Sequence, residues 1–165
     1  MSKRILDACC GSRMFWFDKD NPDVVFVDNR EIHTTLCDGR KLDIKPDIIA
    51  DFTNLPFESD SFYHVVFDPP HMNTLGANSW MALKYGTLKG KEWETMIRDG
   101  FRECMRVLKP NGTLIFKWNE QDIPVSKILE VIGTQPLYGH KSGKLQKTHW
   151  MAFVKEDLDA DNPVD

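Results

Sequence analysis

The sequence predicts an α/β fold with a mostly parallel central sheet, helices on both of its faces and an antiparallel hairpin at the C-terminal end. Two observations lead to this prediction. Short apolar runs, bounded by turns, are continuous rather than alternating, which is typical of parallel strands buried on both faces. Segments with helical spacing of apolar residues occur along the same chain, as in layered α/β domains.

Five apolar runs have the composition of strands: residues 5–8, 24–27, 48–50, 65–67 and 113–118. Four of these runs contain or are followed by an acid: Asp7, Asp28, Asp51 and Asp68. One such acid is ordinarily a turn residue. In open α/β sheets, however, ligands bind beyond the carboxyl ends of the strands, where the strand order reverses. We therefore expect the four acids to converge on one crevice.

Helical spacing is clearest between residues 92 and 108, where the segment ends at a Lys-Pro-Asn-Gly stop signal. A second helix is predicted over residues 125–132, opened by Pro124 and closed by Gly133. Only about a dozen residues separate Gly11 from Val24, so the first helix must be short or irregular. The last strand, residues 148–154, is expected to form the hairpin with residues 136–138.

Length and charge predict a single domain over residues 1–155, followed by an acidic, disordered tail over residues 156–165. The tail holds five acids and no Lys or Arg, whereas residues 1–155 hold 20 acids and 21 basic residues. The net charge of −4 therefore excludes a strongly basic nucleic-acid binder but leaves room for local basic patches.

The sequence has no apolar run long enough for a membrane span, so no membrane partner is expected. The four cysteines lack the spacing of a zinc site, which predicts no metal and reduced thiols in a cytoplasmic protein. A monomer and a homodimer both fit the sequence.

The segment Asp68-Pro69-Pro70-His71 ends the run of residues 63–67. Neither proline has an N–H to continue a strand ladder, so the strand must stop at Asp68. The Asp68 carboxylate and the Pro69 carbonyl then form two adjacent acceptors, and His71 adds a flat ring. Such a set can hold a planar amino group, for example that of a nucleobase. A stiffened turn with a capping Asp is the alternative interpretation.

Small residues follow the first predicted strand, in Asp7-Ala8-Cys9-Cys10-Gly11-Ser12. Such a turn lets a ligand approach the backbone closely. Asp28, at the end of the second strand, suits an acid that binds a ribose diol. Asp51 follows the third strand, where it can accept a hydrogen bond from an adenine amino group.

Two basic segments fit contacts with nucleic-acid phosphates. Lys141, Lys144 and Lys147 lie in a loop without acids, and Lys84 lies in the aromatic and basic segment 72–91 with Trp80. A solvated hairpin is the alternative for the loop, and a core position is the alternative for Trp80.

The motif order resembles the class I S-adenosylmethionine-dependent methyltransferases, over residues 4–154. Residues 9–12 are similar to the Phe-x-Gly-Ser turn of the DNA amino-methyltransferases. Residues 51–62, with Leu-Pro-Phe and Asp-Ser-Phe, and Arg106-Val-Leu-Lys-Pro-Asn-Gly112 are similar to further family segments. Asp68-Pro-Pro-His71 resembles the Pro-Pro motif of enzymes that methylate exocyclic amino nitrogens.

The resemblance implies a Rossmann-like fold, S-adenosylmethionine as cofactor and roles by position. Residues 7–12 would line the methionine part of the cofactor, Asp28 and Asn29 would lie at its ribose, and Asp51 and Phe52 at its adenine. The catalytic set would be Asp68, Pro69, Pro70 and His71, with His71 stacking on the base. The chain departs from the family pattern in having Cys9 and Arg13 at usual glycine positions, and His71 in place of a larger aromatic residue.

The leading interpretation is an N-methyltransferase that acts on N6 of adenine in DNA. RNA or N4 of cytosine as the target, a protein glutamine as the target, and a non-catalytic cofactor-binding module remain alternatives. The chain has no room for a separate target-recognition domain.

Overall fold

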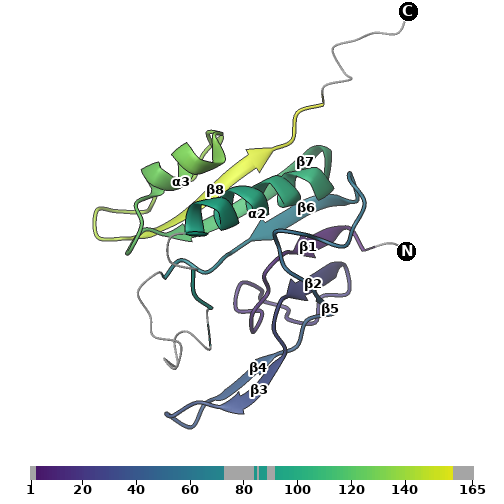
Figure 1. The fold of residues 1–165 in the computed structure, drawn as a ribbon, viewed down its shortest axis with the longest axis vertical. Helices are drawn as coiled ribbons and strands as arrows, with labels where there is room; N and C mark the ends of the chain where they lie inside the picture. The colour runs from purple at the N-terminus through teal and green to yellow at the C-terminus, as the bar shows by residue number, and fades with distance from the viewer. Residues whose placement is uncertain (1–2, 73–83, 85, 89–91, 158–165) are drawn as a thin grey trace, which may run out of the picture.

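A six-stranded sheet with strand order β5-β2-β1-β6-β7-β8 forms the centre of the molecule (Figure 1). The computed structural model describes residues 3–72, 84, 86–88 and 92–157. The strands are β1 (Ile5–Asp7), β2 (Val24–Asp28), β5 (Ile48–Ile49), β6 (Phe62–Phe67), β7 (Leu108–Asn119) and β8 (Thr148–Val154). All neighbouring pairs are parallel except β7 and β8, which are antiparallel. The predicted mostly parallel sheet with flanking helices and an antiparallel C-terminal hairpin is confirmed, whereas the helices of the described residues pack on one face and not on both.

The strand order reverses at β1. The chain first builds outward through β2 to β5, then returns to the other side of β1 with β6 and continues to β7 and β8. This arrangement gathers the carboxyl ends of β1, β2 and β6 at one edge of the sheet, where a doubly wound fold binds its ligand. In the β6–β7 ladder, Phe67 lies opposite Phe116, so Asp68, which directly follows β6, comes beside Lys117, which lies within β7.

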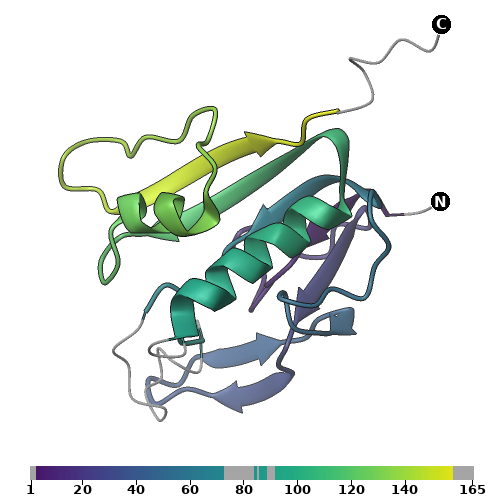
Figure 2. The ribbon, with the colours of Figure 1, turned by 45° about the horizontal axis from the view of Figure 1, so that its top comes forward.

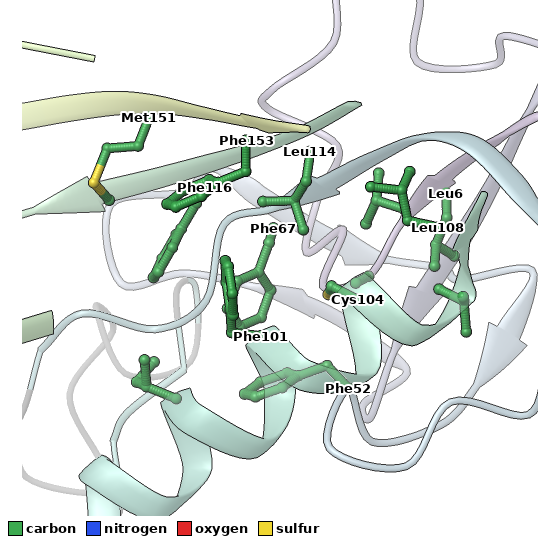
Figure 3. Packing of buried hydrophobic residues seen from close by; sticks show 14 of the residues in the cluster. Leu6, Phe52, Phe67, Phe101, Cys104, Leu108, Leu114, Phe116, Met151 and Phe153 are labelled. Carbon is green, nitrogen blue, oxygen red and sulfur yellow. The ribbon is translucent and has the colours of Figure 1, made fainter. Parts of the chain in front are cut away.

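Two helices, α2 (Trp93–Val107) and α3 (Val125–Ile132), pack on one face of this sheet (Figure 1). Phe101 and Cys104 of α2 meet Phe67, Leu114 and Phe116 of the central strands, and all five side chains are buried (Figure 3). Gly100 allows this close packing, because a Cβ there would lie 2.5 Å from the Phe52 ring. Burial of this apolar cluster is the main stabilising contribution to the fold.

On the opposite face, the connection between β1 and β2 covers the sheet without a helix in the described residues 8–23. Trp16 packs edge-on against Phe26, and Phe15 lies with its ring centroid 5.0 Å from that of Trp150 on β8. The prediction of a short or irregular first helix is therefore wrong for these residues, because the connection consists of turns and bends.

Strand β7 begins earlier than predicted. It starts directly after α2 and includes Lys109-Pro-Asn-Gly112, which the sequence marked as a stop. The stop signal acts as an irregularity inside the strand, because Asn111 has a φ of 62° and the pairing with β6 shifts register between Phe62 and His64. The turn ends the helix without ending the β-structure.

A second, two-stranded sheet was not predicted. Strands β3 (Ile32–Thr35) and β4 (Lys41–Ile44) form an antiparallel hairpin that extends away from the main sheet (Figures 1 and 2). Leu36, Leu42 and Ile44 form its own buried cluster. The tight turn at Asp38-Gly39, where Gly39 has a φ of 82°, and the alternation of Leu42 and Ile44 with charged residues were its sequence signals.

The C-terminal strand β8 matches its predicted range, and its main partner is β7. The predicted pairing with residues 136–138 is one isolated bridge between Tyr138 and Ala152. None of the helices in the described part of the chain is both long and apolar enough to cross a membrane. The last eight residues of the predicted acidic tail, 158–165, lie outside the described residues.

Candidate active site

One cavity of about 430 Å³ opens beyond the carboxyl ends of β1, β2 and β6. Its lining includes almost every site residue that the sequence predicts: Asp7, Cys9, Cys10, Gly11, Ser12, Asp28, Asn29, Asp51, Phe52, Asp68, Pro69, Pro70, His71 and Lys84. The predicted convergence of the four acids is therefore present. The volume is within the roughly 300–1,000 Å³ of typical small-molecule sites.

Four predicted site residues do not line this cavity. Ala8 is buried in the main apolar cluster, and its N–H donates to the carbonyl of Val66. The Lys141 ammonium forms an ion pair with Glu120. Lys144 and Lys147 are exposed in the loop before β8, whose end is joined to β7 by a hydrogen bond from Glu120 N to Lys147 O. Part of the predicted aromatic and basic segment lies outside the described residues, namely residues 73–83, which include Trp80, and residues 85 and 89–91.

Asp7 is a buried carboxyl at the end of β1. It accepts hydrogen bonds from Trp16 Nε1 at 2.7 Å and from the Cys9 N–H at 3.3 Å. Burial nevertheless dominates and raises the pKa of Asp7 to about 7, because a low-dielectric environment disfavours the charged form. Asp7 is thus poised to change charge near neutral pH when a ligand enters the cavity.

Asp28, at the end of β2, closes the turn that follows β1. Its Oδ2 accepts a hydrogen bond from the Gly11 N–H at 2.9 Å. Its Oδ1 accepts bonds from the backbone N–H and from Nε of Arg30, both at 3.0 Å. Gly11 has a φ of 49°, which suits glycine, and a Cβ there would meet nothing within 4 Å. The Gly11 backbone therefore faces open space beside a fixed carboxylate.

Asp51 and Phe52 follow β5. The Asp51 Oδ1 accepts bonds from the N–H and the hydroxyl of Thr53, at 2.9 and 2.7 Å, in the turn geometry common for Asp. Phe52 is buried and packs edge-on against Phe67. The pair presents an exposed carboxylate next to an apolar ring, which is the kind of surface that can accept a purine.

Asp68 is bound by a lysine that the sequence reasoning missed. Lys117 Nζ lies 2.8 Å from Asp68 Oδ2, and both side chains are about one-quarter to one-third exposed, at 31% and 26%. No bond to Oδ1 is seen in the described part of the chain. The ion pair thus fixes one oxygen of the carboxylate and leaves the other available to a ligand in the cavity.

His71 lies beside this pair and is uncharged at neutral pH. Burial lowers the pKa of its imidazole; the Lys117 charge lowers it further, and the charges of Asp68 and Asp122 oppose this with smaller effects. Its ring centroid lies 6.3 Å from that of Trp118, nearly perpendicular to it. A neutral ring lining the cavity suits stacking on a flat ligand.

The cavity also contains residues that the sequence analysis did not identify, chiefly Lys117, Arg30 and Met96. Lys117 had a signal: it is the one charged side chain in the apolar run Leu114-Ile-Phe-Lys-Trp118. Burial raises the pKa values of both cavity-lining thiols, Cys9 and Cys10, which disfavours their thiolate forms. In the residues that the structure describes, no cluster of three His, Cys, Asp or Glu side chains could hold a metal.

No family model matches this sequence, and no curated protein sequence matches it. Solved structures do match its fold. The PH0226 protein of Pyrococcus horikoshii OT3 is 15% identical with a TM-score of 0.59, covering 94% of this chain and 83% of that one. A SAM-dependent methyltransferase from Leishmania major is 12% identical with a TM-score of 0.50, covering 93% and 65%.

The chain has the fold of the SAM-dependent methyltransferases. A third match comes from the complex between the Haloferax volcanii Trm112 methyltransferase activator and a candidate methyltransferase, at 13% identity, a TM-score of 0.50 and coverage of 94% and 84%. Within this methyltransferase fold, the cavity described above occupies the edge where the strand order reverses.

The residues of the cavity fit S-adenosylmethionine (SAM) on the chemistry of their groups. A nucleoside needs an acceptor for its ribose hydroxyls, and Asp28 is a buried carboxylate at a strand end beside the open Gly11 backbone. A cationic ligand needs negative charge, and Asp7, Asp28, Asp51 and Asp68 all line the cavity. Phe52 and Met96 supply apolar surface.

Proposed function

We propose that this protein is a SAM-dependent N-methyltransferase that acts on an exocyclic amino nitrogen of a nucleobase, with N6 of adenine in DNA as the first choice. The observation that carries the proposal is the meeting of two residue sets in one cavity. One set is the glycine turn with the strand-end acids Asp7 and Asp28, and the other is the acceptor pair of Asp68 and Pro69.

The first set would hold the cofactor. Residues 9–12 would lie along its methionine part, Asp28 would accept its ribose hydroxyls, and Asp51 with Phe52 would hold its adenine. When bound, SAM supplies an electrophilic methyl group carried on a sulfonium. Asp7 supports this assignment, because a carboxyl whose pKa is about 7 can ionise in answer to a positively charged ligand.

The second set would hold the substrate. The amino nitrogen of adenine is a poor nucleophile because its lone pair is delocalised into the ring. Hydrogen bonds to Asp68 Oδ1 and to the Pro69 carbonyl would hold the nitrogen closer to pyramidal, so that its lone pair points out of the ring plane. Orientation and electrostatics of this kind accelerate a reaction without a strong base.

Lys117 and His71 would support that geometry. Lys117 holds Asp68 Oδ2 at 2.8 Å, so the carboxylate cannot rotate freely. The neutral His71 ring would stack on the base, and Pro70 keeps the turn stiff. A base inside a duplex would first have to leave the stack, at a cost of a few kcal/mol.

The exposed Lys144 and Lys147, near the carboxyl end of β7, would contact nucleic-acid phosphates, whereas Lys141 is engaged by Glu120. A non-catalytic module is disfavoured, because such a module has no need of Asp68 and Pro69 beside the cofactor turn. Experiment decides whether the substrate is DNA, RNA or a protein glutamine.

The test is mass spectrometry of nucleosides from the DNA and RNA of cells that contain or lack the gene. We expect N6-methyladenine in DNA to disappear when the gene is removed and to return with the intact gene. A complementing gene that carries Asp68→Ala should not restore it, whereas Asp23→Ala, which changes an exposed acid at the amino end of β2, should. Unchanged nucleosides in both DNA and RNA would contradict the proposed substrate class.

A further inference from the structure

A second cavity, of about 780 Å³, lies between the segment after β1 and the β3–β4 hairpin. It shares four lining residues with the candidate active site: Gly11, Ser12, Met14 and Lys84. The two cavities are therefore neighbours along one surface. Nothing in the proposed reaction uses the second one, which we call the hairpin groove.

The hairpin groove is strongly basic for this chain. Six cationic side chains line it, namely Arg13, Lys19, Arg40, Lys41, Lys45 and Lys84, against three acids, Asp20, Asp43 and Asp47. The whole chain carries a net charge of −4, so this excess of cations is local. A local excess next to a ligand cavity raises the concentration of anions there.

The acids of the groove are already engaged by other groups. Asp47 pairs with Lys3 at 2.8 Å and with Arg13 at 3.4 Å, and Asp20 pairs with Arg13 at 3.3 Å. Asp43 is in close contact with the His33 ring across the hairpin. Asp20 and Asp47 are therefore paired with Arg13 and Lys3 rather than with the other lysines of the groove.

Three lysines of the groove have no carboxylate partner in the described part of the chain: Lys19, Lys41 and Lys45. Lys41 and Lys45 are exposed and flank the buried Leu42 and Ile44, which fix the hairpin through its apolar cluster. The Lys19 ammonium lies 3.9 Å from Met14 Sδ, a weak acceptor. Three solvated ammonium groups on fixed backbone thus face one groove.

We propose that the hairpin groove binds the phosphodiester backbone of a single-stranded nucleic acid whose target base enters the neighbouring cavity. This inference rests on the proposed function. A base held near Asp68 carries its phosphates outside the first cavity, and the shared residues lead from that cavity to the three lysines. Ammonium groups bind phosphates as point charges without reading sequence. The β3–β4 hairpin then supplies substrate contacts beside the cavity that holds the target base.

The test is the salt dependence of binding to short fluorescent single-stranded DNA and RNA oligonucleotides of the same base sequence, measured by anisotropy on the full chain. The variant is Lys19→Gln, Lys41→Gln and Lys45→Gln together. The matched control removes three positive charges elsewhere, through Arg102→Gln, Lys109→Gln and Lys127→Gln, which lie on α2, at the start of β7 and on α3. Unfolding in urea and SAM affinity are measured for both variants.

We expect the groove variant to reduce the slope of log K against log salt by about 2, since each phosphate contact on a single strand contributes roughly 0.7. SAM affinity and stability should be unchanged, and the control should keep the native slope. An intact chain that binds neither oligonucleotide, a groove variant with the native slope, or a control that loses as much slope would each overturn the inference.

The outcome is distinguishable from failure of the proposed function. If the slope falls in the groove variant but the intact chain transfers no methyl group to any nucleobase, the groove stands and the proposed activity fails. If nucleobase methylation is present and the groove variant binds oligonucleotides as the native chain does, the activity stands and the inference fails.

Discussion

Lys117 Nζ on β7 and Asp68 Oδ2, directly after the adjacent parallel strand β6, lie 2.8 Å apart, and both residues line the candidate active site. The pair gives Asp68 a fixed orientation. We therefore predict that Lys117 contributes to turnover, although it is not proposed to contact the cofactor.

Lys117→Met should lower kcat by roughly 10–100-fold, because one preorganised electrostatic contact near the reacting group is lost and Asp68 becomes free to rotate. SAM affinity should stay within about twofold of the native value, a change well below the roughly 1.4 kcal/mol that corresponds to a tenfold change in affinity. Lys117→Arg should recover part of the activity. Steady-state kinetics together with calorimetry would check this, and Lys127→Met on exposed α3 is the matched control.

Because of the buried Asp7 carboxyl, we predict that the free energy of unfolding falls as pH rises. Its folded pKa of about 7 lies above the ordinary value of 3.8, so the folded chain binds more protons than the unfolded chain between these pH values. The free-energy cost of keeping the ionised Asp7 carboxylate buried therefore grows from about pH 4 to pH 7 and is complete above pH 7. Relative to Asp7→Asn, which has no titrating group here, the native chain should lose up to about 4 kcal/mol of stability between pH 4 and pH 8, at 1.36 kcal/mol per pKa unit.

The same substitution should impair ligand binding. SAM affinity of the native chain should rise as pH increases through about 7, because Asp7 ionises there and attracts the cationic ligand. Asp7→Asn should bind more weakly, without this rise. Urea unfolding and calorimetry at pH 5 and pH 8 test both effects, and a stability difference between the two chains that does not change with pH would refute the argument.

Asp28→Ala should weaken SAM binding by about 1–3 kcal/mol, the scale of a hydrogen bond to a charged group. The substitution also removes the acceptor of the Gly11 N–H, so the turn after β1 loses its anchor. Calorimetry checks the affinity. Asp23→Ala, at the amino end of β2, should bind normally, and equal affinities in the two variants would reject the assignment of the cofactor pocket.

Arg13 occupies a backbone conformation usually reserved for glycine, with a φ of 56°. Its guanidinium offsets this strain by donating to the carbonyls of Lys19 at 2.7 Å and Lys45 at 2.8 Å, and it lies 3.9 Å from the centre of the Phe26 ring. Both Arg13→Gly and Arg13→Ala should destabilise the fold. The alanine variant should be worse by about 1–2 kcal/mol, because only glycine adopts this φ without strain. Urea unfolding that ranks the two variants in the reverse order would contradict the account.

The sequence analysis located the strands and helices well because their signals are local. Pro69 and Pro70 stop β6, and Gly133 ends α3 with a φ of 69°. The convergence of Asp7, Asp28 and Asp68 was also predictable, since the carboxyl ends of parallel strands meet at one edge. These features depend on residue type and order alone.

The features that the sequence analysis missed depend on contacts between residues that are distant in the sequence or on weak local signals. The Lys117–Asp68 ion pair follows from the β6–β7 register, which joins residues 49 positions apart. Lys141 looked free in the sequence, but the fold places Glu120 beside it. The hairpin of β3 and β4 was overlooked because its exposed strands are short and largely polar.

The most direct test of the central claim is transfer of a labelled methyl group from SAM to DNA by the purified chain, with RNA and protein as parallel substrates. The account predicts labelled N6-methyladenine with the native chain, and a loss on the order of 10²–10³-fold with Asp68→Ala at unchanged SAM affinity. His71→Ala should lose less, on the roughly 1–3 kcal/mol scale of one base stack, and His71→Tyr should remain active. Full activity in Asp68→Ala, or labelling of none of the three substrates by the native chain, would contradict the account.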